Sequence, residues 1–448
     1  MPRELLAWCR AGAAWCRAGA RPADTAVTRP IPNPGGAMAP PRTLLIVLAG
    51  GAGARLGSVA DAAAASALRF AGSHRLIDFP LSHARNSGIP DVWVLERHHA
   101  ITAHLAGGRP WDLDRTRGGL VVRGLGEVAD GAAAGSADAL WAQVDAIGAY
   151  EPEVVLVAPA DAVYRMDYSA VAAEHLRIGA AATVVTTRYD GDRSRHGVVV
   201  VREGRVTHYA HRPRVARTDV IATGVLAFEP RELLARLTSL RRDRAGDGAL
   251  GDIGERLMPG VADAGDAVEL RHTGYWRDVG TVAEYWRAHM DLLTRPPFDL
   301  DDPAWPISTR QLRHAAARLT AGAEVDRALV SAGAVVEGTV RRSVLGPGVH
   351  VSPGAVVSDA VLLDDVRIGP GAQVHRAVVD EGARVRGRAE VGAPAPTGPA
   401  AEADAAVEAG AAVGTGAAVG DGEIALVGAR AVVHPRKRVP PGGRYGAR

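Results

Sequence analysis

The chain has 448 residues but a single lysine, Lys437, and only two cysteines, Cys9 and Cys16, both within the first twenty residues. The rest of the chain therefore has no thiol for a disulfide or a Cys-ligated zinc site, which fits a reducing cytoplasm. Cationic chemistry must come almost entirely from arginine. No apolar run is long enough for a signal peptide or a membrane span, and a formal charge of +2 gives no bias toward nucleic acid. We expect neither a membrane nor a nucleic acid as partner.

The N-terminal segment differs in composition from the rest of the chain. The stretch "AWCRAGA" occurs twice in succession, over residues 7–13 and 14–20, and a proline-rich stretch then runs to Met38. We expect residues 1–40 to lie outside the fold, either as a disordered tail or as the product of a mis-annotated start codon, with Met38 as the initiator.

From residue 42 onward, short apolar runs alternate with segments of helical spacing. This alternation predicts an α/β domain over residues 41–295 with a mostly parallel, Rossmann-like sheet. The expected strands are "TLLIVLAG", "DVWVLE", "EVVLVAPAD" and "AATVVTTRYD". Residues 136–150 read as one helix that Ser136 could cap, and residues 196–213 as a hairpin turning at Glu203 and Gly204.

A different regime begins after a proline-punctuated linker, residues 296–320. Aliphatic residues recur at every sixth position, which is typical of a parallel β-helix and predicts a left-handed coil over residues 321–448, with a loop at 393–406. Chance recurrence in a valine-rich chain is the alternative. The recurring residues are Val356, Leu362, Ile368, Val374, Val385 and Val391, and later Val407, Val413 and Val419.

Ligands of open α/β sheets collect at the carboxyl ends of the strands, where this chain has a glycine-rich turn and Asp161. In "AGGAGARL", the amides of Gly50, Gly51 and Gly53 could approach a phosphate that Arg55 would neutralise. The turn has neither the Lys-Ser/Thr pair of a P-loop nor dinucleotide-fingerprint spacing. An ordinary tight turn is the alternative interpretation.

Longer motifs point to one family. "LAGGAGARL", "RLIDFPLSHARNSGI", "GSADAL", "DAVYRMDY", "GVLAFEP", "GYWRDVGTVAEYWRAHMDLL" and "WPISTR" occur in the order found in glucose-1-phosphate adenylyltransferases, which this chain resembles from Arg42 to about Val391. The resemblance implies that ATP and glucose 1-phosphate are converted to ADP-glucose and pyrophosphate, a step of glycogen synthesis. It also implies a tetramer, or an oligomer with another family member, with an anionic effector bound between catalytic domain and coil.

Such a reaction brings two anions together, so positioning and charge neutralisation matter more than a general base. Mg²⁺ held by carboxylates would supply part of that charge. Asp161 is a candidate ligand because it ends a strongly apolar strand, and the resemblance implies Asp278, which matches the family's other metal-binding aspartate, as the second. A turn cap is the alternative for Asp161; a salt bridge to Arg277 or a turn cap is the alternative for Asp278.

With the resemblance, the candidate site residues fall into a catalytic, a nucleotide-binding and a sugar-phosphate-binding set. Arg212 takes the place of a family lysine that grips the sugar phosphate, and arginine can bind phosphate bidentately. The catalytic set is Arg55, Asp161 and Asp278; the nucleotide set is Leu48, Gly50, Gly51, Gly53, Gly135, Ser136 and Asp138; the sugar-phosphate set is Gly197, His211, Arg212, Ala222 and Asp252.

Several family side chains are missing. The family's threonine, arginine, lysine and proline after the glycine turn are replaced by small residues, and so are its tyrosine and arginine before "GSAD". The substituted positions are Ala54, Ala63, Ala65, Ser66, Ala133 and Ala134. These substitutions leave three hypotheses: a working adenylyltransferase, a non-catalytic regulatory paralogue, or a transferase for another nucleotide. An acyltransferase in the coil is weaker, because its histidines are scattered in sequence.

Overall fold

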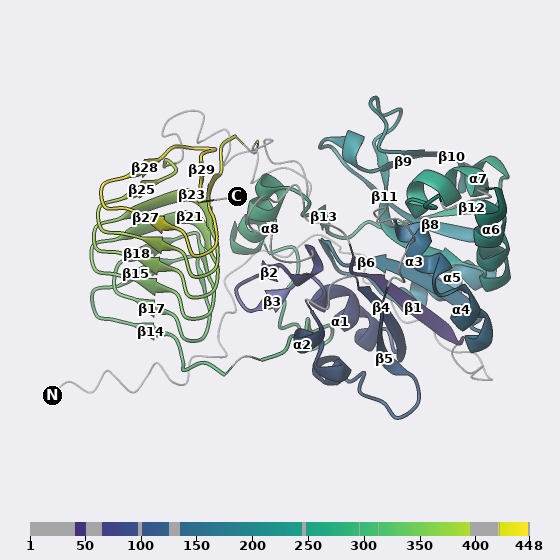
Figure 1. The fold of residues 1–448 in the computed structure, drawn as a ribbon, viewed down its shortest axis with the longest axis horizontal. Helices are drawn as coiled ribbons and strands as arrows, with labels where there is room; N and C mark the ends of the chain where they lie inside the picture. Colours follow the sequence, from purple (N-terminus) through teal and green to yellow (C-terminus); the bar gives the residue numbers. More distant parts are fainter. Residues whose placement is uncertain are drawn as a thin grey trace, which may run out of the picture. The chain divides into compact units, whose positions relative to one another are not determined.

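The structure is a computed structural model, and it describes residues 41–50, 65–96, 101–124, 135–243, 248–294, 296–311, 313–394, 420 and 422–446. The prediction for residues 1–40 lies outside this range. Residues 41–448 form one compact unit. Its first part contains a nine-stranded sheet and its last part a coil of short strands (Figure 1).

The central sheet is mostly parallel, as predicted. In spatial order its strands are β5 (Gly119–Gly124), β4 (Asp91–Glu96), β1 (Thr43–Leu48), β6 (Val154–Pro159), β11 (Val220–Phe228), β8 (Ala182–Arg188), β12 (Ala267–Arg271), β10 (Arg205–His211) and β9 (Gly197–Arg202). Among these described strands only β10 and β11 run against the common direction. β1 and β6 are continuous apolar runs because both of their faces are covered.

Two hydrophobic cores lie on opposite faces of this sheet. Ile46 and Val157 belong to one core, whereas their neighbours Val47 and Leu156 belong to the other, as the two-residue period of a strand requires. The helices divide between these cores. The first core takes α3 (Ser136–Trp141), α4 (Val144–Tyr150), α6 (Pro230–Asp243) and α7 (Met258–Asp263); the second takes α1 (Asp78–Asn86), α2 (Thr102–Leu105) and α5 (Tyr168–Ile178).

The helix predicted over residues 136–150 is two helices, α3 and α4. They are separated at Gln143, whose backbone is not helical (φ −108°, ψ 3°) and whose side chain donates to the Gly124 carbonyl at 3.2 Å. The prediction that Ser136 caps this helix was also wrong, since Gly135 is the N-cap residue. The hairpin is confirmed: β9 and β10 are joined at Glu203 and Gly204, both with positive φ, as a two-residue turn requires.

The C-terminal coil is a parallel β-helix, as the hexad pattern predicted. Figure 1 shows its turns stacked on one another. Its strands are β14 (Arg318–Leu319), β15 (Glu324–Asp326), β16 (Leu329–Val330), β17 (Val335–Val336), β18 (Thr339–Arg341), β19 (Val344–Leu345), β20 (His350–Val351), β21 (Val356–Leu362), β22 (Arg367–Ile368), β23 (Gln373–Val379), β24 (Arg384–Val385), β25 (Glu390–Val391), β26 (Ala425–Val427), β27 (Val432–Val433), β28 (Arg438–Val439) and β29 (Arg444–Tyr445).

The strict six-residue period was wrong in detail. From β18 to β25 ladder partners such as Gln373 and Glu390 are 17 residues apart, so a turn there has two sides of six residues and one of five, whereas earlier partners such as Glu324 and Thr339 are 15 apart. Val357 is therefore the fully buried residue, whereas the predicted Val356 is half-buried. Leu362, Ile368, Val374, Val385 and Val391 are fully buried, as expected.

One turn of the coil is much longer than the others. Glu390 pairs with Arg438, which is 48 residues further along the chain instead of 17. The additional residues therefore enter between β25 and β26 without breaking the stack. Most of the predicted loop at 393–406, together with Val407, Val413 and Val419, lies outside the described residues.

The segment that joins the two parts is bound to the first of them. The Trp305 indole donates to His83 Nδ1 at 3.1 Å, and the Ser308 amide donates to Ser82 Oγ at 2.9 Å. The Trp111 indole donates to the Ser308 carbonyl at 3.0 Å. Two motifs far apart in sequence, "DFPLSHARN" and "WPIST", are thus complementary halves of one contact.

Candidate active site

Asp161 directly precedes one strand, and Asp278 ends the strand that pairs with it. Asp161 lies between β6 and β7 (Ala162–Tyr164), and β7 pairs antiparallel with β13 (Trp276–Asp278) so that Asp278 faces Ala162. The Val279 amide also donates to the Asp161 carbonyl at 3.3 Å. Residues 117 positions apart are thereby placed side by side at the carboxyl end of β6, where ligands of such sheets bind.

The two carboxylates interact through their charges. Burial, together with the smaller effect of the nearby Asp278 charge, raises the pKa of Asp161 to about 6, and the guanidinium of Arg212 opposes this shift. Arg212 itself is exposed, so its planar cation is accessible to a ligand at this edge. The structure thus places two of the predicted residues, Asp161 and Asp278, side by side, and the charge of a third, Arg212, acts on Asp161.

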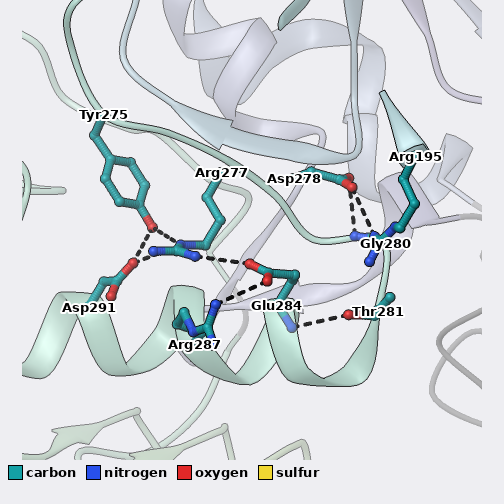
Figure 2. A network of polar contacts seen from close by, with 9 residues as sticks. All are labelled: Arg195, Tyr275, Arg277, Asp278, Gly280, Thr281, Glu284, Arg287 and Asp291. Carbon is teal, nitrogen blue, oxygen red and sulfur yellow. Dashed lines mark hydrogen bonds and ion pairs between the residues drawn. The ribbon is translucent and has the colours of Figure 1, made fainter. Parts of the chain in front are cut away.

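Asp278 is held by contacts that the sequence did not indicate. Its carboxylate pairs with Arg195 at 3.1 Å and accepts the Gly280 amide at 3.1 Å (Figure 2). The contact with Gly280 is a turn cap, one of the two alternatives for this residue. The salt bridge to Arg277 was wrong, because the Arg277 side chain points away toward Glu284 and Asp291. Arg195 was not among the predicted site residues. The only sequence signal that could have suggested it is its position two residues before Gly197.

The donor set at this edge fits magnesium. Mg²⁺ is commonly held by one or two carboxylates, with phosphate oxygens and waters completing the shell. Asp161 and Asp278 supply two such carboxylates and leave room in the shell for a substrate phosphate. Among the described residues, no three or more His, Cys, Asp or Glu side chains lie together so that they could hold a metal ion by themselves.

Three of the predicted sugar-phosphate residues lie on the β9–β10 hairpin or directly after it. Gly197 pairs with His211, and a Cβ at Gly197 would lie 2.2 Å from the Tyr209 hydroxyl, so this glycine leaves space for the tyrosine ring. Burial and then the Arg212 charge lower the pKa of His211, whereas Asp252 opposes the shift. His211 is therefore neutral near pH 7, with Nε2 3.8 Å from the Asp252 carboxylate.

The motifs "GSAD" and "GDIG" bind each other. The Ser136 amide and hydroxyl donate to Asp252 Oδ1 at 3.1 and 3.2 Å. Asp138 is buried and accepts the amides of Leu250, Gly251 and Gly135 at 2.7 to 2.9 Å. Both carboxylate oxygens of Asp138 are thus committed to backbone amides, and this residue braces the two loops.

Gly135 and Ala222 contribute by their small size. A Cβ on Gly135 would lie 2.2 Å from the Gly251 backbone, so only glycine permits this close approach. Ala222 is buried opposite Thr186 and has no polar group to offer a sugar phosphate. Nearby, the Trp276 indole donates to the Thr223 carbonyl at 3.2 Å and its ring stands edge-to-face on His196, an aromatic wall that sequence reasoning missed although Trp276 lies in "YWRD".

The glycine turn begins beside this edge. Leu48 ends β1 in register with Pro159, two residues before Asp161, and the Ala49 amide donates to the Leu95 carbonyl at 3.0 Å. Gly50 is the last described residue of the turn. Gly51, Gly53, Ala54, Arg55, Ala63, Ala133 and Ala134 lie outside the described residues.

Ala65 and Ser66 lie in a short 3₁₀ helix, Ala65–Ala67, and both are buried. The Ser66 hydroxyl donates to the Ala49 carbonyl at 3.1 Å. The position at which the family has lysine is therefore filled by a small apolar side chain close to the glycine turn.

These features define a nucleotidyl transferase. The nucleotidyl transferase family model matches residues 44–295, and the model described as GlmU-like, C-terminal hexapeptide matches residues 314–420, in agreement with the predicted left-handed β-helix.

The chain belongs to the glucose-1-phosphate adenylyltransferase family. Proteins of that name from Acetivibrio thermocellus and Thermotoga neapolitana are 33% and 35% identical to it, over 72% and 70% of this chain and 77% and 75% of those proteins. A third, from Fervidobacterium nodosum, is 29% identical over 78% of this chain and 85% of its own length. In the described part of the chain, no helix combines the length and apolar character needed to cross a bilayer.

Proposed function

We propose that this protein is a working adenylyltransferase of the cytoplasm that joins ATP and glucose 1-phosphate into ADP-glucose with release of pyrophosphate. The observation that carries this proposal is the side-by-side placement of Asp161 and Asp278 at the sheet edge where the glycine turn begins, with the charge of Arg212 acting on Asp161. The names of the relatives suggest the substrates, and two carboxylates with a nearby cation are groups that a site for two phosphates would need.

The residues present suit an in-line displacement at the nucleotide α-phosphate. The attacking phosphate oxygen of the sugar is already anionic, so no general base has to remove a proton. Arg212 would hold the sugar phosphate, and its exposed fork allows bidentate contact. Asp161 and Asp278 would hold Mg²⁺, which supplies positive charge to the phosphates when it is bound. The amides of the glycine turn would receive the nucleotide phosphates.

A regulatory paralogue is the second candidate, and a specific observation favours it. Ala65 and Ser66 are both buried, so this position offers no cation to a triphosphate. Removing one preorganised donor from a transition state costs about 2.7 to 4 kcal/mol, or roughly 10² to 10³ in rate. A slow enzyme and a non-catalytic partner of a family member would differ in turnover while sharing this fold.

The deciding assay is pyrophosphate release by purified protein with Mg²⁺, glucose 1-phosphate and each nucleoside triphosphate in turn. Release with ATP that is lost in Asp161→Asn and kept in Asp145→Asn, an exposed carboxylate on α4, supports the enzyme. Release with another triphosphate would show that the enzyme uses a nucleotide other than ATP. No release, together with stimulation of an active family member, supports the paralogue.

We also propose that the protein assembles as a homotetramer, or as an oligomer with a family member, and responds to an anionic effector. This part rests on family membership alone. A sedimentation measurement that gives four chains supports the homotetramer. A purely monomeric species, alone and with a family member, would contradict both assemblies.

A further inference from the structure

A small hairpin lies between helix α8 (Val282–Thr294) and the β-helix. Its strands are β2 (Arg69–Phe70) and β3 (His74–Arg75), with Ala71 and Gly72 in the turn at positive φ. The Ala71 amide donates to His289 Nε2 on α8 at 3.2 Å. A Cβ on Gly72 would lie 2.1 Å from Ser331 Oγ of the coil. The turn therefore touches both neighbours without room for a larger residue.

One carboxylate of the coil fixes this hairpin by its charge. Asp364, just after β21, pairs with Arg69 at 2.6 Å, and each side chain is only 13% exposed. Arg69 also donates to the Ser73 carbonyl across the hairpin at 3.1 Å. Arg75 is close enough to Asp364 to interact with its charge: burial and then Arg69 lower the pKa of Arg75, while Asp364 opposes this. Asp364 of the coil is thus the ion-pair partner of Arg69, and it shares the charge of Arg75 with Asp78 and Glu381.

Hydrogen bonds from the hairpin and from Ile77 hold residues 66 and 67, and Ser66 in turn bonds to the start of the glycine turn. The Arg75 guanidinium donates to the Ala67 carbonyl, and the Ile77 amide donates to the Ser66 carbonyl at 3.1 Å. The Ser66 hydroxyl donates to the carbonyl of Ala49 at 3.1 Å. Ala49 directly precedes Gly50, where the phosphate-binding turn begins.

We propose that Asp364 of the β-helix is a positioning residue for the nucleotide: through its ion pair with Arg69 it fixes the hairpin and thereby the segment 65–77, which in turn supports the glycine turn. The last step rests on the proposed function of that turn. The β-helix then contributes to the geometry of the nucleotide site, because loss of the Asp364 charge leaves the largely buried Arg69 guanidinium without the anion that it pairs with.

The test compares Asp364→Asn, Asp364→Glu and Asp365→Asn in the full-length protein. Asp365 is the adjacent carboxylate and is exposed, so its variant is a matched control. Hydrogen–deuterium exchange at the amides of Leu68, Leu76 and Ile77 reports on the segment itself, independently of activity. We expect these amides to exchange at least about tenfold faster in Asp364→Asn than in the wild type and at the wild-type rate in Asp365→Asn. In Asp364→Glu the exchange rate should return part of the way to the wild-type value.

The second readout separates positioning from stability. KM for ATP should rise several-fold in Asp364→Asn while KM for glucose 1-phosphate stays unchanged; calorimetric ATP binding replaces KM if turnover is too slow. Unchanged exchange overturns the proposal whatever the enzyme does. Faster exchange with unaltered ATP binding overturns the step to the glycine turn. If the wild-type protein binds no nucleotide at all, the proposed function and that last step fail together, and the exchange result still decides the coupling of coil to hairpin.

Discussion

Arg277 offers a sharp test of which residues in "YWRDVG" serve the fold. Its side chain lies under the site, 5% exposed, and donates to Asp291 at 2.8 Å, to Glu284 at 2.9 Å and to the Tyr275 hydroxyl at 3.2 Å (Figure 2). Both acids belong to α8. The substitution Arg277→Met keeps a long apolar stem and removes the charge with all of its donors.

The magnitude depends on the groups that lose their partner. Burial alone would lower the pKa of Arg277, but Tyr275, Asp291 and Glu284 outweigh it and raise the pKa, so the residue is charged. Removing one partner of a buried ion pair costs about 3–5 kcal/mol. Glu284 keeps Arg287 at 3.1 Å, and Asp291 keeps the Tyr275 hydroxyl at 2.8 Å with a 27% exposed side chain. We therefore expect a loss of about 3 kcal/mol, the lower end of that range.

Urea unfolding at neutral pH measures this loss. Arg109→Met is the matched control, because the pair of Arg109 with Asp114 spans 3.3 Å but is 83% and 41% exposed. An exposed pair of this kind contributes about 0–1 kcal/mol. If Arg277→Met lost no more stability than Arg109→Met, the reasoning that this motif arginine anchors α8 beneath Asp278 would be refuted.

Three further predictions concern other parts of the molecule. Burial lowers the pKa of His289 to about 4, below the roughly 6.5 of the unfolded chain, so protons favour unfolding and about 3 kcal/mol of stability is lost as pH falls from about 6.5 to 4. His289→Gln should flatten that part of the stability profile, and an unaltered slope would contradict it. Gly197→Ala should cost about 1–3 kcal/mol and raise KM for glucose 1-phosphate more than KM for ATP, because its Cβ would collide with Tyr209; equal KM values for wild type and variant would argue against it. Ala65→Lys should raise pyrophosphate release, with Ala65→Met as the size control, and a folded variant without gain would indicate a remodelled pocket.

Sequence periodicity was sufficient for the architecture. Short apolar runs between helical segments and the six-residue pattern of the coil are local features, so they are visible in short windows of the sequence. They predicted the sheet, the hairpin at Glu203 and Gly204, and the stacked coil. They missed the 17-residue turn, because whether Val356 or Val357 points inward depends on the turn below it, and they missed the break at Gln143, which coincides with a hydrogen bond to another strand.

Motifs were sufficient to propose a site, but they did not show which of its residues are available to a ligand and which hold the surrounding loops in place. "GSAD" suggested nucleotide contacts for Asp138, whereas its carboxylate accepts three backbone amides. Arg195 carried no signal of its own, yet it pairs with Asp278. A motif indicates that a residue matters. Only the contacts of that residue show whether it can bind a ligand or supports the local structure.

The sequence by itself determined which segments become strands, helices and coil turns, because those preferences are local. Only the tertiary structure decided that Asp161 and Asp278 lie side by side, that Arg195 pairs with Asp278, and that Asp364 of the coil pairs with Arg69, 295 residues earlier. Contacts between residues so far apart in sequence depend on how the helices and strands pack. An ion pair between two such elements produces no repeating pattern in the sequence.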